Sequence, residues 1–301
     1  MTNLNSPIFQ DEAAAIEHME ASRWPNGPVC PHCGSVEATK MGGKTQAGMF
    51  QCNGCRDKFT VRTGTVFERS HIPLHKWLLA MHLMASSKKG ISAHQLHRSL
   101  GITYKSAWFM AHRIREAMAP AKGSSSPIGG AGKTVEADET FLNRSPKTKK
   151  KPTNRPNTKG GEQVFSLVER GGKTRSIFID NTNVRSVLRQ AIHEDSRLVT
   201  DGAQHFKGQF VNHESVDHSK REYVRGDVHT NTLEGFFSIL KRGLVGVYQH
   251  VDKRHLERYL AEFDFRQNTR AKLGVDDAQR AALILKGAEG KRLTYNQPDR
   301  S

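Results

Sequence analysis

Residues 30–55, CPHCGSVEATKMGGKTQAGMFQCNGC, decide the fold of the first part of the chain. They contain two Cys-x-x-Cys pairs, Cys30 with Cys33 and Cys52 with Cys55, separated by 18 residues. Two such turns on neighbouring hairpins place four thiolates around one zinc ion, and a site with all four positions filled is structural rather than catalytic. Two disulfides or a redox pair are the alternatives, but neither explains a duplicated motif in a chain without a secretion signal. We therefore predict a zinc ribbon.

The size and charge of the chain indicate its class of partner. The 301 residues are enough for two or three folded domains. Lysine and arginine total 46 against 30 acidic residues, which gives a net charge of +16 and is typical of proteins that bind nucleic acid. No stretch approaches the roughly 18 apolar residues of a membrane span. We expect a soluble cytoplasmic protein whose partner is nucleic acid rather than a membrane.

Residues 72–118 contain three amphipathic segments with helix start and stop signals. The first ends at Gly90, the second runs from a capping-box pattern at Ser92 to Gly101, and the third is capped by Thr103. Two short helices around a glycine turn are typical of a helix-turn-helix. The alternative is an ordinary three-helix packing unit whose basic residues form a solvated face.

A helix-turn-helix would place the first residues of its second helix at base edges in the major groove. This geometry nominates Tyr104, Lys105 and Ser106 for base contacts, and Arg113 on a later turn of the same helix for a further DNA contact.

Two stretches of low complexity separate the remaining elements. Residues 119–133 are rich in Gly, Ser and Pro and predict a flexible linker. Residues 145–161, SPKTKKKPTNRPNTKGG, predict a basic loop inside the C-terminal domain. Its cations could hold DNA phosphates, or the loop could be solubilising without contacting DNA.

Three carboxylates stand out in the C-terminal half, where strands and helices alternate as in an α/β domain. Asp138 lies within a predicted strand, Asp201 ends a later strand, and Glu234 lies near the start of a helix. Converging carboxylates are the ligands that Mg²⁺ or Mn²⁺ needs for phosphoryl transfer. The alternatives are a turn role for Asp201, solvated carboxylates around Asp138, and a capping box formed by Asn231 with Glu234.

The ordered set of motifs resembles one family, the zinc-ribbon DDE transposases of bacterial insertion sequences (ISXO-like). The motifs are WPNGPVCPHCGS and QCNGC, then FTVRTGTVFERSHIPLHKW, VEADETFL, VTDG, HTNTLEGFFSILKRG and EFDFRQN, and the resemblance runs in this order from about residue 24 to about residue 295. The resemblance implies that Asp138, Asp201 and Glu234 are the catalytic acids, which hold magnesium or manganese. It implies that Lys241 grips DNA, and Arg242 beside it is expected to hold backbone phosphates. Asn231 or His229 could contribute at the third position.

The resemblance also implies a fold and an activity. We expect an α/β multidomain protein with an N-terminal helix and zinc ribbon (1–71), a helix-turn-helix module (72–118), a linker (119–133) and a ribonuclease H-like mixed-sheet catalytic domain (134–301) that ends in helices. It would bind the terminal inverted repeats of its element as at least a dimer, and cut and join DNA in the bacterial nucleoid. The alternatives are a DNA-binding regulator derived from a transposase and a metal-dependent nuclease without joining activity.

Overall fold

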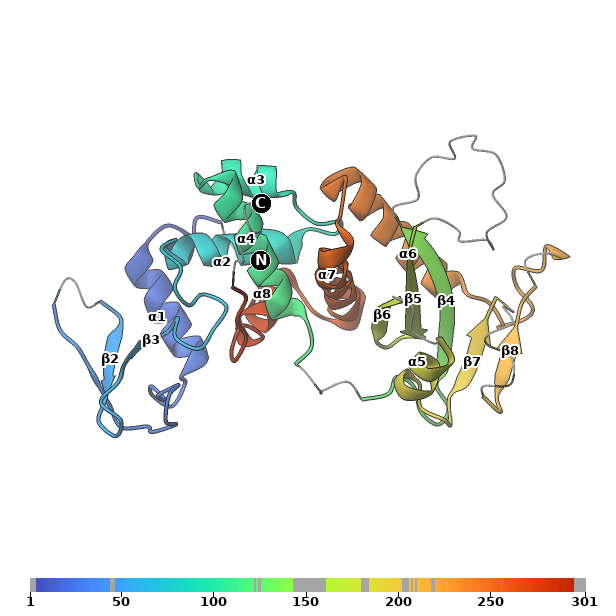
Figure 1. Ribbon diagram of the computed structural model, residues 1–301, viewed down its shortest axis with the longest axis horizontal. Coiled ribbons are helices and arrows are strands. Elements are labelled where there is room, and N and C mark those ends of the chain that lie inside the picture. Colours follow the sequence, from blue (N-terminus) through green and yellow to red (C-terminus); the bar gives the residue numbers. More distant parts are fainter. Residues whose placement is uncertain are drawn as a thin grey trace, which may run out of the picture. The chain divides into compact units, whose positions relative to one another are not determined.

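The computed structural model describes residues 4–294 except for 44–46, 122, 124–125, 143–160, 180–183, 202–205, 207, 209 and 218–219. The chain forms two compact units, the first from residues 1–120 together with 269–301 and the second from residues 121–268 (Figure 1). This division differs from the expected one, because residues 269–301 return to the first unit instead of staying with the domain that begins at residue 134.

The first unit begins with helices and a small antiparallel sheet. Its elements are η1 (Pro7–Phe9), α1 (Glu12–Arg23), β1 (Ala38–Lys40), β2 (Met49–Cys52) and β3 (Lys58–Thr60), with the strand order β1-β2-β3. The Asp11 carboxylate caps α1 by accepting the Ala14 N–H at 2.8 Å. The Trp24 ring packs edge-on against the rings of Phe50 and Phe59, at centroid distances of 5.5 and 5.7 Å. These rings give the sheet an aromatic core.

Three helices follow in the order that the sequence predicts. They are α2 (Leu74–Ser86), α3 (Ala93–Leu100) and α4 (Tyr104–Met118). Ser92 and Thr103 cap α3 and α4 through their hydroxyls, as predicted. Gly101 ends α3 with φ of 59°, the left-handed conformation that glycine adopts readily. The helix α2 ends earlier than predicted, at Ser86 rather than Gly90, because the backbone at Ser87 is extended.

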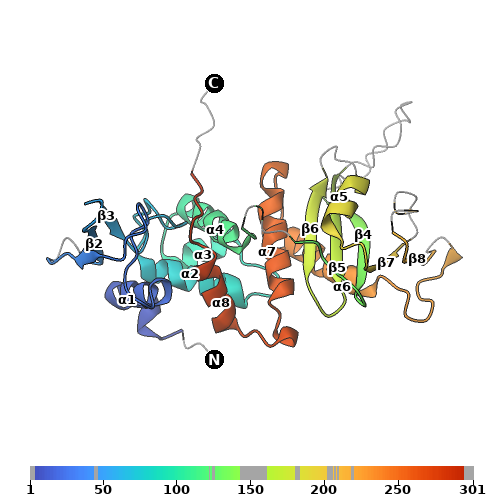
Figure 2. The same ribbon diagram turned by 90° about the horizontal axis from the view of Figure 1, so that it is seen from below.

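A helix from the last part of the chain completes the first unit. After η7 (Ala271–Leu273), α8 (Asp277–Lys286) packs against α2 and α4 (Figure 2). The Arg280 side chain, which is 8% exposed, donates to the Ala85 carbonyl at 2.8 Å and to the Thr269 carbonyl at 2.9 Å. Beyond α8, Lys291 Nζ donates to the Glu116 carbonyl at 3.0 Å, at the end of α4. The C-terminal segment therefore holds the ends of two earlier helices.

Gly287 lies where α8 meets α4, and its lack of a side chain is required there. A Cβ at Gly287 would lie 2.3 Å from the carbonyl oxygen of Ala117, a backbone atom that moves only with the end of α4. We expect Gly287→Ala to lower the free energy of unfolding of this unit by about 1–3 kcal/mol. The control is Gly42→Ala, whose Cβ would meet nothing within 4 Å. Urea titrations followed by tryptophan fluorescence measure the effect, and equal midpoints for the two variants would contradict it.

The second unit is a five-stranded mixed sheet with helices on both faces. Its strands are β4 (Thr134–Leu142), β5 (Glu162–Glu169), β6 (Thr174–Ile179), β7 (Arg197–Thr200) and β8 (His213–Ser215). The strand order is β6-β5-β4-β7-β8; β4, β5 and β6 pair antiparallel, whereas β7 and β8 pair in parallel. The predicted α/β class is confirmed, and β5 and β6 pair as an antiparallel hairpin.

Alternation along β4 sorts its side chains between the two helical layers. The helices are α5 (Val184–Ala191), α6 (Asn231–Gly243) and α7 (Leu256–Asn268), with the π-helical turn η5 (Leu244–Tyr248) and the short η6 (Lys253–His255) between the last two. Val135 and Ala137 pack in the core that α5 covers, whereas Leu142 packs in the core beneath α6 and α7. The residues of β4 with even numbers therefore face α6.

The helix α7 covers the free edge of the sheet at β6. The Asp264 carboxylate accepts the Ser176 N–H at 2.6 Å and the Ser176 hydroxyl at 2.7 Å, and the Asn268 side-chain oxygen accepts the Thr174 N–H at 2.6 Å. Because these amides would otherwise be an unpaired strand edge, α7 prevents pairing with another chain there. Burial raises the pKa of Asp264 to about 6, despite the hydrogen bonds from Ser176, which lower it.

The raised pKa of Asp264 predicts that ionisation of its carboxylate lowers the free energy of unfolding at higher pH. Because the folded state holds the proton more tightly than the unfolded state, wild-type stability falls as the pH rises from about 4 to about 6. Asn cannot ionise, so we expect Asp264→Asn to be more stable than wild type above about pH 6, by up to about 3 kcal/mol. Below about pH 4 this gain should vanish. Urea titrations followed by circular dichroism test the expectation, and a stability difference that does not change with pH would refute it.

Candidate metal centres and nucleic-acid interface

The four cysteines form one cluster, as the spacing predicts. The Cys30 and Cys55 sulfurs lie 3.7 Å apart and the Cys33 and Cys52 sulfurs 3.5 Å apart, and all four lie within 4.8 Å of one another. The Cys55 backbone N–H, donated to the Cys52 sulfur, is the main cause that lowers the pKa of Cys52 to about 6. A thiolate is the form that binds metal, so the cluster fits a tetrahedral zinc ion.

Strand pairing brings two of the predicted acids together. The strands β4 and β7 run parallel, and their last registered pair is Ala137 with Thr200. One residue further along each strand stand Asp138 and Asp201, which therefore lie side by side. Burial, together with the charges of Asp201, Glu139 and Glu234, raises the pKa of Asp138 to about 7, although the hydrogen bond from the Glu139 N–H lowers it. The arrangement concentrates negative charge that a divalent cation would neutralise.

Glu234 reaches this region from the first turn of α6. Its side chain is exposed, and its carboxylate accepts the Thr230 hydroxyl at 3.4 Å. The three acids are less tightly gathered than the cysteines, which form the only group of three or more potential ligands within 4.8 Å among the described residues. Glu234 is therefore near enough to raise the pKa of Asp138 without sharing one tight cluster with both aspartates.

A buried carboxylate that sequence reasoning missed caps α6. Glu136 has no exposed surface and accepts the Leu233 N–H at 3.0 Å and the Thr232 hydroxyl at 2.9 Å. The alternative of a capping box between Asn231 and Glu234 is wrong, because α6 begins at Asn231 and Glu136 takes that role. The alternation along VEAD, which puts Glu136 on the face of Asp138, was the signal available in the sequence.

The exposed face of α6 continues from Glu234 to two cations. Glu234, Ser238, Lys241 and Arg242 are all exposed. The Arg242 guanidinium donates to the Ser238 carbonyl at 3.0 Å and to the Ser238 hydroxyl at 2.8 Å, which holds it along the helix. Lys241 Nζ lies 5.9 Å from the centre of the Phe237 ring. The acidic Glu234 and the basic Lys241 and Arg242 therefore share one exposed face of α6.

The start of α4 presents the predicted base-contacting residues. Tyr104 is 44% exposed and stacks on His94 of α3 at a ring distance of 4.3 Å. Lys105 is exposed and Ser106 is half-buried. Arg113 is not presented for DNA: it is 6% exposed, and its guanidinium donates to the Glu68 carbonyl at 2.5 Å. Arg113 therefore helps to hold the core of the first unit together.

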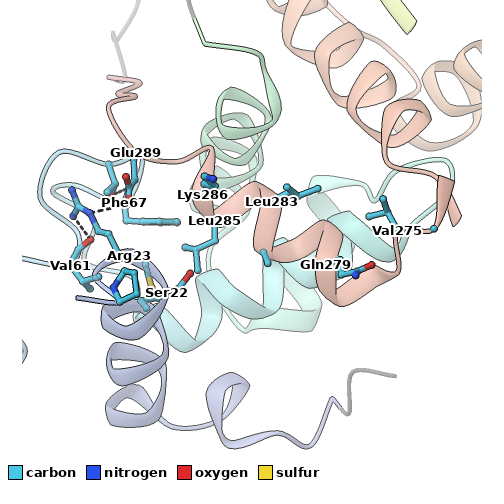
Figure 3. Close-up of a pocket in the computed structure, with 15 residues that line it drawn as sticks. Ser22, Arg23, Val61, Phe67, Val275, Gln279, Leu283, Leu285, Lys286 and Glu289 are labelled. Carbon is cyan, nitrogen blue, oxygen red and sulfur yellow. Dashed lines mark hydrogen bonds and ion pairs between the residues drawn. The ribbon is translucent and has the colours of Figure 1, made fainter. Parts of the chain in front are cut away.

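A cavity of about 740 Å³ lies in the first unit, between α1, α8 and the segment after β3 (Figure 3). Val61, Phe67 and Leu285 give it apolar walls. At its rim, Arg23 donates to the Val61 carbonyl at 2.9 Å and pairs with Glu289 at 3.3 Å. None of the three predicted acids lines this cavity.

Two further predictions concern the basic loop and the absence of a membrane-spanning segment. The basic loop predicted at 145–161 lies, apart from its last residue, outside the described residues. Within the described part of the chain, no helix combines the length and apolar character needed to cross a membrane.

Comparisons with known proteins agree with this arrangement. Residues 129–268 match the ISXO2-like transposase domain, and residues 10–58 match the transposase zinc-ribbon domain. The chain is 28% identical over 288 residues to an uncharacterized protein in transposable element ISH50 of Halobacterium salinarum, an alignment that covers 88% of this chain and 94% of that protein. No solved structure matches the chain.

Proposed function

Since the chain belongs to the ISXO2-like family of zinc-ribbon DDE transposases, we propose that it cuts and joins DNA at the ends of an insertion sequence. The observation that carries this proposal is the position of Asp138 and Asp201, each one residue beyond the last pair of the parallel strands β4 and β7, with Glu234 close enough to raise the pKa of Asp138. The strand order β6-β5-β4-β7-β8 supports a ribonuclease H-like fold for the second unit.

The three acids would hold the catalytic metal. Carboxylate oxygens are the ligands that Mg²⁺ and Mn²⁺ prefer, and the mutual repulsion of these acids favours a bound cation. When bound, a divalent metal ion activates the attacking oxygen and stabilises the leaving oxygen of a phosphoryl transfer. Water first breaks a phosphodiester at the element end and frees a 3′ hydroxyl, which then attacks a phosphodiester of the target and releases a second 3′ hydroxyl.

The other proposed residues hold DNA while this chemistry proceeds. Lys241 and Arg242, on the same exposed face as Glu234, would contact backbone phosphates, an interaction that weakens steeply with salt. We assign α3 and α4 to a helix-turn-helix that reads the terminal repeat through Tyr104, Lys105 and Ser106, beside a zinc ribbon that stabilises the unit. Two element ends must be paired before joining, so at least two protomers act together.

The decisive experiment uses the DNA that flanks the gene, because a transposase gene lies between the ends on which its product acts. We expect wild type to bind, cut and join labelled flanking DNA when Mg²⁺ or Mn²⁺ is present. Asp201→Ala should bind the same DNA and cut it at least about 1000-fold more slowly, since it loses a proposed metal ligand. The matched control is Asp195→Ala, which removes a side chain that is 62% exposed in the same unit. Equal cutting by all three proteins would refute the assignment.

The same experiment separates the two other functions. Specific binding without cutting by either wild type or Asp201→Ala would identify a DNA-binding regulator. Cutting without joined products would identify a nuclease that lacks strand transfer.

A further inference from the structure

Glu136 links the strand and the helix that carry two of the proposed catalytic acids. On one side, its strand β4 carries Asp138 two residues later, and alternation places both carboxylates on the face toward α6. On the other side, its oxygens accept the Thr232 hydroxyl at 2.9 Å and the Leu233 N–H at 3.0 Å. Both partners belong to the first turn of α6, directly before Glu234. One buried side chain thus connects the strand of one acid to the helix of another.

The start of α6 depends on this carboxylate. A helix has unpaired N–H groups in its first turn, and the residue before the helix usually supplies the acceptor. Here that residue is Thr230, and its side chain makes no capping bond. The Glu136 carboxylate replaces it from a strand nearly a hundred residues earlier in the chain. Its negative charge also complements the positive end of the helix dipole.

Arg170 fastens the segment that leads into α6. Its Nε bonds Glu136 at 2.7 Å, and its other nitrogens donate to the Asp227 and His229 carbonyls, each at 2.8 Å. The same guanidinium lies 3.3 Å from Nδ1 of His229. The chain before Glu234 is therefore tied at several points to Glu136 and to the turn after β5.

We infer that Glu136 is a positioning residue: through Thr232, Leu233 and Arg170 it sets the place of Glu234 relative to Asp138, and thereby the affinity of the site for divalent metal. This inference rests on the proposed function, since it concerns the same acids. Side chains that orient metal ligands commonly change metal affinity 10- to 100-fold when they are replaced. Glu136 acts one step further back, through the helix that carries the ligand.

Glu136→Gln tests the inference on the full-length protein without DNA. The amide keeps one acceptor for Leu233 but loses the charge that pairs with Arg170. Calorimetric titration with Mn²⁺ is expected to show affinity reduced by about 10-fold or more, in protein whose circular dichroism is unchanged. The matched control is Glu169→Gln, which breaks the ion pair of another largely buried glutamate of the same sheet, to Lys133 at 3.5 Å. Its Mn²⁺ affinity should equal that of wild type.

Two further variants keep the test decisive. Thr232→Val preserves side-chain shape and removes a single bond to Glu136, so it should weaken Mn²⁺ binding in the same direction but less. In a Glu234→Gln background, Glu136→Gln should have no further effect on Mn²⁺ affinity, because the residue through which it acts is already lost. A merely structural role would instead lower thermal stability without changing the affinity of the folded protein.

The outcomes distinguish this inference from the proposed function. If Glu234→Gln weakens Mn²⁺ binding but Glu136→Gln matches Glu169→Gln, the positioning role is overturned and the catalytic assignment stands. Additive effects of Glu136→Gln and Glu234→Gln would also overturn it, since they would mean independent action. If Glu234→Gln leaves Mn²⁺ affinity unchanged, both the assignment of Glu234 and the inference fail.

Discussion

Deleting residues 269–301 is expected to abolish binding to the element ends, although no proposed DNA-binding residue lies in that segment. The deletion removes α8, whose Ile284 has no exposed surface and whose Leu285 is 9% exposed. Each such side chain contributes about 1.5–3 kcal/mol by burial, and a domain has only about 5–15 kcal/mol of stability in total. The deletion also removes Arg280 from α2 and Lys291 from the end of α4.

Two measurements check this expectation. The three tryptophans, Trp24, Trp77 and Trp108, all belong to the first unit, so their fluorescence reports its folding alone. The 1–268 chain should lose the cooperative urea transition and bind terminal-repeat DNA at least about 100-fold more weakly in an anisotropy assay. The control is a chain that ends at residue 294, which keeps every contact described for α8. Native-like melting and full affinity of the 1–268 chain would contradict the role of α8.

Asp138→Asn is expected to stabilise the protein while it abolishes cutting. At about pH 8 the wild-type carboxylate is partly buried beside Asp201 and Glu234, whose charges oppose its ionisation. The amide is neutral and can still accept the Glu139 N–H, which now bonds Asp138 at 2.6 Å. Without divalent metal, we expect the variant to gain on the order of 2 kcal/mol of stability.

Divalent metal should reverse this order of stability, so that wild type becomes more stable than Asp138→Asn. A ligand that binds only the folded state raises its stability, and the variant lacks one of the proposed ligands. Thermal unfolding in chelator and in excess Mn²⁺ is the measurement: Mn²⁺ should raise the melting temperature of wild type far more than that of Asp138→Asn. The exposed Asp195→Asn serves as control and should behave as wild type. Loss of stability in chelator, or an equal Mn²⁺ shift in all three proteins, would sink the expectation.

The parts of the molecule that depend on local spacing could be predicted from the sequence. The four cysteines, the caps at Ser92 and Thr103 and the turn at Gly101 all act within a few residues or within one hairpin motif. The proximity of Asp138 to Asp201 could not be derived in this way, because it depends on the register of two parallel strands far apart in the chain. The position of these acids near the ends of predicted strands only nominates them, and the resemblance of the motifs to a transposase family supports the assignment.

The sequence also could not separate basic residues that face solvent from those that build the fold. Arg113 lies on α4 at a position where a DNA contact was plausible, yet it donates to a backbone carbonyl in the core. Arg62 and Arg280 likewise donate to backbone carbonyls of the first unit. Burial lowers the pKa of Arg62 and Arg113. The net charge of +16 therefore overstates the cations that are available to DNA.

The return of residues 269–294 to the first unit has a consequence for how the protein is made. A ribosome releases the zinc ribbon, α3 and α4 first, but the helix that completes their core emerges only after the whole second unit has been synthesised. Prematurely terminated chains would therefore lack a completed first unit, and they would not compete with the full-length protein for the proposed DNA sites at the element ends. In this topology, the proposed DNA-recognition unit is completed only after the proposed catalytic unit has been synthesised on the same polypeptide.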